Sequence, residues 1–168
     1  MSEEARRAFG LGFSLLLAAM LQLVFADALQ IKGAKPDFLL LFALLGSLFC
    51  DLNGGAALGF FAGLIHASFA APPHGGFGSL IVNRTLVSGF VGWLEDRVFR
   101  DSPIMTPLFA FAGTLVAETL FYLSVPQGRL RHRVFIALGT ALYNAVLALP
   151  VYLLLRRLTG LRKAADRI

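Results

Sequence analysis

The chain has 168 residues, of which 57% are hydrophobic and only 15% are charged, and its mean hydropathy is +0.74. A soluble domain carries about 25% charged residues, so these values exclude a water-soluble enzyme, a disordered chain and a secreted disulfide scaffold. The 15 Lys and Arg residues against 10 Asp and Glu give a net charge of +5, and the single cysteine, Cys50, forms no internal disulfide. The sequence therefore predicts an integral membrane protein, in which the position of each charge decides orientation.

Six apolar segments follow one another along the chain, and we expect each to cross the bilayer as a helix. They span residues 9–26, 36–50, 55–71, 77–94, 103–125 and 134–155. A bilayer core of about 30 Å needs roughly 20 helical residues, and the segments hold only three charged side chains, Asp37, Arg84 and Glu118. Runs such as 39–42 are apolar on every side, which excludes the alternating pattern of barrel strands. The sequence thus predicts an all-α membrane protein, a six-transmembrane-helix bundle that forms a single polytopic domain over residues 1–168.

The second and third segments are short, with 15 and 17 residues by these bounds. Three interpretations are open: a thin local membrane, helices buried by their neighbours, or one re-entrant hairpin that turns at 51–54. Because hydrophobic mismatch costs only fractions of a kcal/mol per Å, we favour two short helices. The first segment follows Arg6 and Arg7 as the apolar part of a signal peptide does, but the five apolar segments after it favour an uncleaved helix.

Basic residues in the connections predict the orientation, because Lys and Arg accumulate in short cytoplasmic loops. With six spans both chain ends lie on one side, which carries nine Lys and Arg residues, whereas the opposite side carries five. The nine are Arg6, Arg7, Arg97, Arg100, Arg156, Arg157, Arg162, Lys163 and Arg167, and the five are Lys32, Lys35, Arg129, Arg131 and Arg133. This excess places both termini in the cytoplasm. The basic segment 129–133 does not fit this orientation, because it would lie outside. It leaves two alternatives open: a chain with five spans, or an outer loop that binds an acidic surface.

Small residues and prolines mark where helices pack and bend. Glycines lie four residues apart on one face of the third segment, at Gly55, Gly59 and Gly63. Small residues let membrane helices approach closely, so this face either packs inside the bundle or docks the single helix of a partner, and residues 88–92 carry a second such stripe. Pro107 and Pro150 fall inside the fifth and sixth segments, and since proline removes a helical hydrogen bond, we expect a kink at each.

Polar side chains within the apolar segments define a candidate site. Besides the border residue Asp37 they include Gln22, His66, Asn83, Arg84, Glu118 and Asn144. Counted from the outer border, Arg84 and Glu118 both lie about 10 Å deep, so we expect an ion pair that offsets the cost of burying each charge. The whole set indicates either an outward-facing polar pocket or separate interhelical hydrogen bonds, and the sequence leaves this choice open.

Catalytic and cofactor motifs are not found in the sequence. His66, His74 and His132 lack metal-ligand spacing, and no serine stands in a hydrolase motif with His66. The chain also has no phosphate-binding loop, dinucleotide fingerprint or paired carboxylates. We therefore expect a protein that is not an enzyme, binds no cofactor or metal, and contacts membrane lipid rather than nucleic acid.

The order of several short motifs is that of a known family. In chain order the motifs are Pro36-Asp37, Gly55-x3-Gly59-Phe60-x2-Gly63, Tyr143-Asn144, Pro150 and Arg156-Arg157. Together with six spans and a short basic tail, this pattern covers almost the whole chain and resembles the bacterial rod shape-determining protein MreD. Members of that family often carry Asp where this chain has Ala67, and His66 lies beside that position.

The resemblance implies a non-enzymatic scaffold in the bacterial inner membrane, a subunit of the elongasome that helps position peptidoglycan synthesis and maintains rod cell shape. The implied partner is MreC, a bitopic protein with one membrane helix, with links to the actin-like MreB and to RodA and its transpeptidase. The implied fold is similar to that of the substrate-binding subunits of energy-coupling-factor transporters, so a solute-binding membrane subunit of a vitamin transporter is the alternative. The residues carried over, in architectural or partner-contacting roles, are Pro36, Asp37, Gly59, Phe60, Gly63, Asn144 and Pro150.

Overall fold

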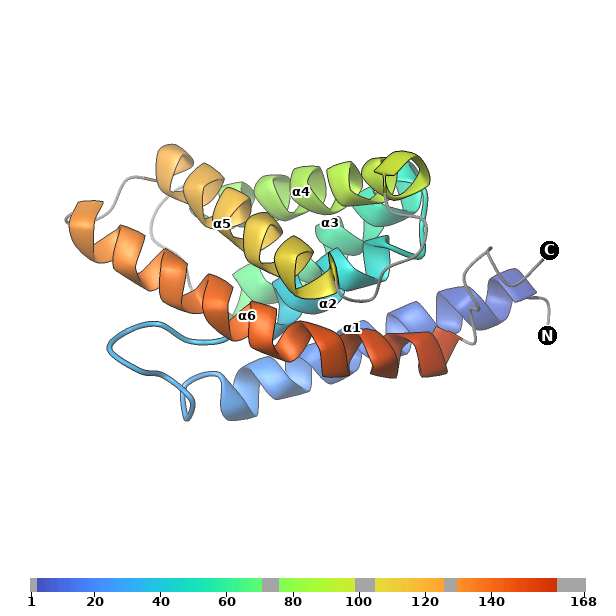
Figure 1. The fold of residues 1–168 in the computed structure, drawn as a ribbon, viewed down its shortest axis with the longest axis horizontal. Coiled ribbons are helices and arrows are strands. Elements are labelled where there is room, and N and C mark those ends of the chain that lie inside the picture. The colour runs from blue at the N-terminus through green and yellow to red at the C-terminus, as the bar shows by residue number, and fades with distance from the viewer. Residues whose placement is uncertain (1–2, 71–75, 99–104, 126–129, 160–168) are drawn as a thin grey trace.

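The computed structural model describes residues 3–70, 76–98, 105–125 and 130–159 (Figure 1). Its helices are α1 (Glu3–Phe25), α2 (Phe38–Ser47), α3 (Leu52–Ala70), α4 (Gly76–Val98), α5 (Thr106–Ser124) and α6 (Leu130–Thr159). Within the described ranges no strand occurs, and the predicted all-α fold is confirmed. The predicted segment limits at 71 and 103, and Arg129 of the basic segment, lie outside the described residues.

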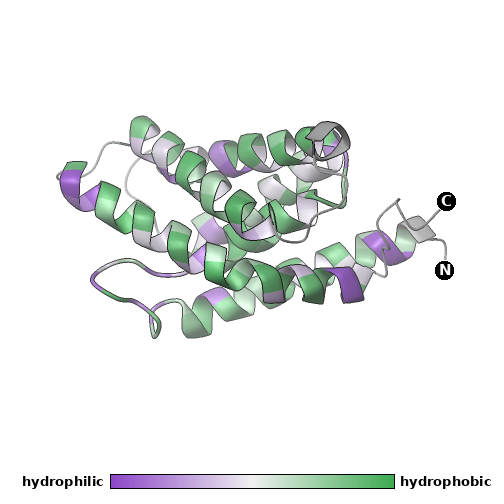
Figure 2. Cartoon of the chain, viewed as in Figure 1, coloured by the Kyte–Doolittle hydropathy of each residue, from purple (hydrophilic) through white to green (hydrophobic). Residues whose placement is uncertain are grey.

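Five of the six helices are long and apolar enough to cross a membrane. α1, α3, α4, α5 and α6 have 23, 19, 23, 19 and 30 residues. Figure 2 shows hydrophobic residues along their length, with hydrophilic residues at both ends of α6. Many large apolar side chains on the outer helix faces are exposed, among them Phe9, Leu86 and Val146. Because so large an apolar surface is unfavourable in water, these helices indicate a multi-pass membrane protein.

The second predicted span is wrong in length, since α2 has 10 residues and not the 15 of segment 36–50. A helix of 10 residues is about 15 Å long, half the thickness of a bilayer core. Its start is fixed by Pro36, which has no N–H to donate, and by Asp37, whose carboxylate caps the helix. The connection 26–37 is therefore non-helical and leads into the bundle before α2 begins.

α2 forms the core of the bundle. All ten of its residues are buried, and it contacts each of the other five helices (Figure 1). Phe42 and its leucine neighbours Leu39, Leu40 and Leu41 are almost fully enclosed. Between membrane helices, dispersion contacts of such side chains stabilise packing more than the removal of water does. Of the three interpretations of a short second segment, the structure supports burial by neighbouring helices.

The described ends of the chain lie together at one end of the bundle (Figure 1). Gly10 in α1 packs on the last turn of α6, where an added Cβ would lie 2.8 Å from the carbonyl oxygen of Leu158. The connection 26–37 and the first turn of α6 lie at the opposite end. The side of a membrane that each end faces stays a prediction.

The glycine face of α3 packs against α4. An added Cβ at Gly55 would lie 2.6 Å from the carbonyl oxygen of Ser88, and Gly59 and Gly63 come similarly close to other backbone atoms of α4. The second small stripe, at 88–92, belongs to the same contact. Because α4 covers this face, there is no room on it for the helix of a partner.

The two prolines differ in position. Pro107 lies in the first turn of α5. Backbone N–H groups in the first turn have no acceptor within the helix, so Pro107 removes no helical hydrogen bond, and the kink predicted there is wrong. Pro150 lies inside α6, where the sequence placed it, and a bend at that residue stays a prediction.

Candidate functional site

The site is built around the buried start of α2. The first backbone N–H groups of a helix have no acceptor inside it, and here two other helices provide one. The N–H of Asp37 donates to Oδ1 of Asn144 in α6 at 3.1 Å. The N–H of Phe38 donates to Oε1 of Gln22 in α1 at 2.7 Å. Two of the predicted polar residues are thus caps that allow a helix to begin inside the bundle.

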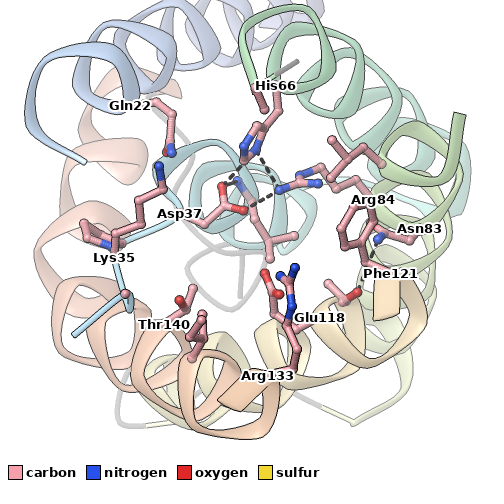
Figure 3. Close-up of a pocket in the computed structure, with 17 residues that line it drawn as sticks. Gln22, Lys35, Asp37, His66, Asn83, Arg84, Glu118, Phe121, Arg133 and Thr140 are labelled. Carbon is pink, nitrogen blue, oxygen red and sulfur yellow. Dashed lines mark hydrogen bonds and ion pairs between the residues drawn. The ribbon is translucent and has the colours of Figure 1, made fainter. Parts of the chain in front are cut away.

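A buried ion cluster lies beside this helix start (Figure 3). The guanidinium of Arg84 in α4 donates a hydrogen bond to the carboxylate of Asp37, and both side chains are more than nine-tenths buried. Nδ1 of His66 in α3 lies 2.7 Å from the same guanidinium and 3.5 Å from Oδ1 of Asp37. The cluster therefore joins α2, α3 and α4 at one point.

The predicted ion pair between Arg84 and Glu118 is wrong, because Arg84 pairs with Asp37 instead. Within the described part of the chain no ion pair joins Arg84 to Glu118. The prediction placed Asp37 at the membrane border, as the first residues of a full-length span would be. Because α2 begins inside the bundle, Asp37 reaches the depth of Arg84.

Two further hydrogen bonds join α5 to α6 and to α4. Nδ2 of Asn144 donates to Oγ1 of Thr114 at 2.9 Å. Nδ2 of Asn83 donates to the backbone carbonyl of Ala117 at 3.2 Å. Sequence reasoning missed Thr114, because a threonine in an apolar helix usually bonds to its own backbone and gives no separate signal. The capping role of Asp37 did have a signal, since Asp directly before an apolar run is typical of a helix N-terminus.

A cavity of about 300 Å³ adjoins the cluster (Figure 3). Its wall carries five charged side chains, which are Lys35, Asp37, Arg84, Glu118 and Arg133. Of the six predicted intramembrane polar residues, all except Asn144 line it. The wall also includes Ala70 at the end of α3 and part of the connection 26–37, so the cavity lies toward the end of the bundle opposite the described chain ends. The structure thus brings most of the predicted polar residues together at one pocket, and interhelical hydrogen bonds of Gln22, Asn83 and Asn144 lie beside it. That the pocket faces outward stays a prediction.

The charges of the cavity wall differ in how they are stabilised. Burying a charge is costly unless it is paired and hydrogen-bonded, and Arg84 and Asp37 meet that condition together. Lys35 donates to the carboxylate of Asp27 at 2.6 Å, outside the spans, where both side chains are exposed. This hydrogen bond, together with the charge of the ammonium, lowers the pKa of Asp27. An exposed pair of this kind contributes little to stability.

The side chains around the cavity are suited to binding and orienting polar groups. In the described ranges no group of three His, Cys, Asp or Glu side chains is placed to hold a metal ion.

Comparisons of the chain with protein-family models, curated proteins and solved structures found no match. The expected likeness to energy-coupling-factor subunits and to MreD therefore stays a prediction.

Proposed function

We propose that this protein is a non-enzymatic scaffold of the MreD kind in the bacterial inner membrane. In this proposal it binds an MreC-like bitopic protein and helps position peptidoglycan synthesis along a rod-shaped cell. The supporting observation is that motifs far apart in the sequence meet in one place. The backbone N–H of Asp37 donates to Asn144, 107 residues later in the chain. The side chain of Asp37 binds Arg84, whose backbone packs on Gly59.

The residues of these motifs support helices and their contacts. Asp37 caps α2, Asn144 accepts its first N–H, and Gly59 allows α3 and α4 to touch. Buried hydrogen bonds and ion pairs between helices favour one arrangement of the elements that they join. A bundle fixed in this way presents constant outer faces, which is what a partner's membrane helix needs for van der Waals packing.

The helix of the partner has to meet an outer face, because α4 covers the glycine face of α3. Phe60, one of the residues carried over from the resemblance, is 43% exposed in α3. Its ring meets the ring of Phe61 edge-to-face, with 5.6 Å between the centroids. We assign this aromatic pair to the contact with the partner's membrane helix. RodA, its transpeptidase and MreB would then join through the assembled complex.

Co-purification tests the proposal. The protein and the MreC-like protein of the same bacterium are co-expressed and extracted in mild detergent, and we expect them to elute together. Phe60→Ala should weaken capture at least about tenfold, since an aromatic anchor of an interface contributes roughly 2 kcal/mol or more. Phe135→Ala removes an equally large side chain, 52% exposed, from α6 and should leave capture unchanged.

The outcomes separate the two parts of the proposal. If the two proteins stay apart while each remains folded, the scaffold function is refuted. If they elute together and Phe60→Ala captures the partner as well as the parent does, only the assignment of the Phe60 face is refuted.

The cavity favours a second candidate, a solute-binding membrane subunit of an energy-coupling-factor vitamin transporter. Its wall carries the polar side chains of Gln22, His66, Asn83 and Thr140 besides the five charged ones, and such groups favour a guest that forms hydrogen bonds. A small molecule that co-purifies in a 1:1 ratio and raises the Tm would support this candidate, and a panel of vitamins that leaves the Tm unchanged would count against it.

A further inference from the structure

Two helix ends that are far apart in the sequence come together at one end of the bundle (Figure 1). α1 begins there and α6 ends there, and Gly10 of α1 packs directly on the backbone of Leu158 in α6. The fold therefore gathers basic side chains that lie at opposite ends of the sequence. The first turns of α1 and the last turn of α6 carry four arginines, which are Arg6, Arg7, Arg156 and Arg157.

Positive charge is in excess at this end of α1 and α6. Residues 1–10 and 156–168 contain seven Lys and Arg residues against three Asp and Glu residues, an excess of four positive charges. The ion pairs found among the described residues lie elsewhere, so none of them neutralises an arginine at this end. Asp51, Glu95 and Asp96 lie just before α3 and at the end of α4, and these parts are apart from the ends of α1 and α6 (Figure 1). Charge complementarity therefore favours an anionic partner.

Helix periodicity shows which arginines lie on the outer side of the contact between α1 and α6. Successive helical residues are rotated by about 100°. Arg6 is exposed and lies one turn before the glycine of α1 that packs on Leu158. Thr159 is buried and occupies the inner side of α6 after Leu158, so the exposed Arg157, which precedes Leu158, lies on the outer side. Arg156 is turned away from α1. Arg6 and Arg157 thus flank the outer side of the same contact.

Exposed apolar side chains follow both arginines toward the middle of the bundle. Leu153 lies one turn from Arg157 on the same face of α6 and is 47% exposed. Phe13 lies two turns from Arg6 on the same face of α1 and is 48% exposed. Figure 2 shows this change from hydrophilic to hydrophobic residues along both helix ends.

This order of groups matches that of a phospholipid. Guanidinium groups bind phosphate with charge-assisted hydrogen bonds, and hydrocarbon chains pack on exposed apolar side chains by dispersion contacts. An acidic surface of a soluble protein would match the arginines alone. A lipid with a net negative headgroup matches both the charge and the apolar side chains next to it.

We propose that the outer side of the contact between α1 and α6 binds an anionic phospholipid. The guanidinium groups of Arg6 and Arg157 hold its phosphate, and its hydrocarbon chains lie along Phe13 and Leu153. This site goes beyond the scaffold function and depends on no protein partner.

Three probes test the proposal on the full-length protein purified in dodecyl maltoside, by native mass spectrometry and thermal unfolding. Dioleoyl-phosphatidylglycerol is anionic, dioleoyl-phosphatidylcholine has the same chains and no net charge, and sn-glycerol 3-phosphate has no chains. We expect phosphatidylglycerol to bind and to raise the Tm, and the other two to bind at least about tenfold more weakly.

Each other result overturns the proposal. Equal binding of phosphatidylcholine would show that the arginines do not select an anionic lipid. Equal binding of glycerol phosphate would assign the arginines to a soluble anion. No binding of phosphatidylglycerol would leave an acidic protein as the class of partner that fits this charge.

Matched variants locate the site. Arg6→Gln and Arg157→Gln should each weaken phosphatidylglycerol binding about fivefold, the effect of one basic residue near an anionic lipid. Arg156→Gln removes the neighbouring charge, which is turned away from α1, and should weaken binding less. Arg131→Gln removes an exposed arginine from the opposite end of α6 and should have little effect.

The comparison between the variants decides the placement of the lipid. Equal weakening by Arg157→Gln, Arg156→Gln and Arg131→Gln would mean attraction by surface charge alone, and would refute the site. Unchanged binding in a folded Arg157→Gln protein would refute it as well. The Tm without lipid shows whether each variant is folded, and if Arg6→Gln is not, the comparison of Arg157→Gln with Arg156→Gln decides.

Discussion

The backbone of Gly59 lies directly against the carbonyl of Arg84, whose side chain binds Asp37. The close contact of α3 with α4 and the buried ion cluster are therefore parts of one structure. A shift of the α4 backbone away from Gly59 would also move Cα of Arg84, from which the side chain reaches Asp37. The glycine face and the intramembrane charge, which look independent in the sequence, depend on each other.

Gly59→Ala should destabilise the protein strongly. The added Cβ would lie 2.7 Å from the carbonyl carbon of Arg84 and 2.8 Å from Cβ of Ser88. Overpacking of this kind costs typically about 1–3 kcal/mol, and displacement of Arg84 should add to the loss. Thermal unfolding in detergent measures it. Gly12→Ala is the control, since nothing lies within 4 Å of its added Cβ, and an equal loss in both variants would contradict the packing argument.

Neutralising one member of the ion pair should cost more than neutralising both. Arg84→Met leaves the carboxylate of Asp37 buried without its guanidinium, and breaking a buried pair costs roughly 3–5 kcal/mol. Adding Asp37→Asn, which keeps an oxygen to cap α2, should recover part of that loss. A double-mutant cycle on the free energy of unfolding measures the coupling. Strictly additive losses would show that the pair contributes nothing.

Glu118→Gln should destabilise the protein less than Arg84→Met does. Glu118 lies on the cavity wall and forms no ion pair with Arg84 in the described structure. Its neutral form therefore leaves the buried cluster intact. Thermal unfolding of both variants in the same detergent compares their losses of stability. Equal losses would favour the pair of Arg84 with Glu118 that the sequence predicted.

Asn144→Leu should cost more stability than Tyr143→Phe, although the two residues are adjacent in α6. Loss of the Asn144 amide leaves the N–H of Asp37 buried without an acceptor, and an unsatisfied buried group costs about 1–3 kcal/mol. The hydroxyl of Tyr143 donates to the carbonyl of Leu29 at 2.7 Å in an exposed setting, where water can replace it.

Hydrogen exchange gives an independent measure of the same change. The N–H of Asp37 should exchange faster in Asn144→Leu than in the parent protein, whereas Tyr143→Phe should leave it protected. Unchanged protection in Asn144→Leu would mean that Asn144 does not hold the start of α2.

The long helices and the polar cluster could be predicted because they depend on local features of the chain. Run length identifies a span, and polar groups are rare in hydrocarbon unless they face one another or a cavity. The length of α2 could not be predicted in this way, since segment 36–50 is apolar almost throughout. Asp37 was missed as the partner of Arg84 for the same reason. A full-length second span would place Asp37 at the membrane border, whereas Arg84 was expected deeper, at the level of Glu118.

The role of the glycine face also depends on information outside the local sequence. A stripe such as Gly55, Gly59 and Gly63 has the same composition whether its neighbour is α4 or the helix of another protein. Only the position of α4 along that stripe decides between the two. The tertiary arrangement likewise encloses α2, which is too short to reach across the bilayer core on its own.

The shortness of α2 has a consequence for biosynthesis. A segment of ten residues does not partition into lipid by itself, and the groups that complete its first turn come from α1 and from α6. A nascent chain therefore holds an unfinished half-helix until α6 has emerged from the ribosome. A chain truncated before residue 144 should therefore leave the first N–H group of this buried helix start without its acceptor in α6.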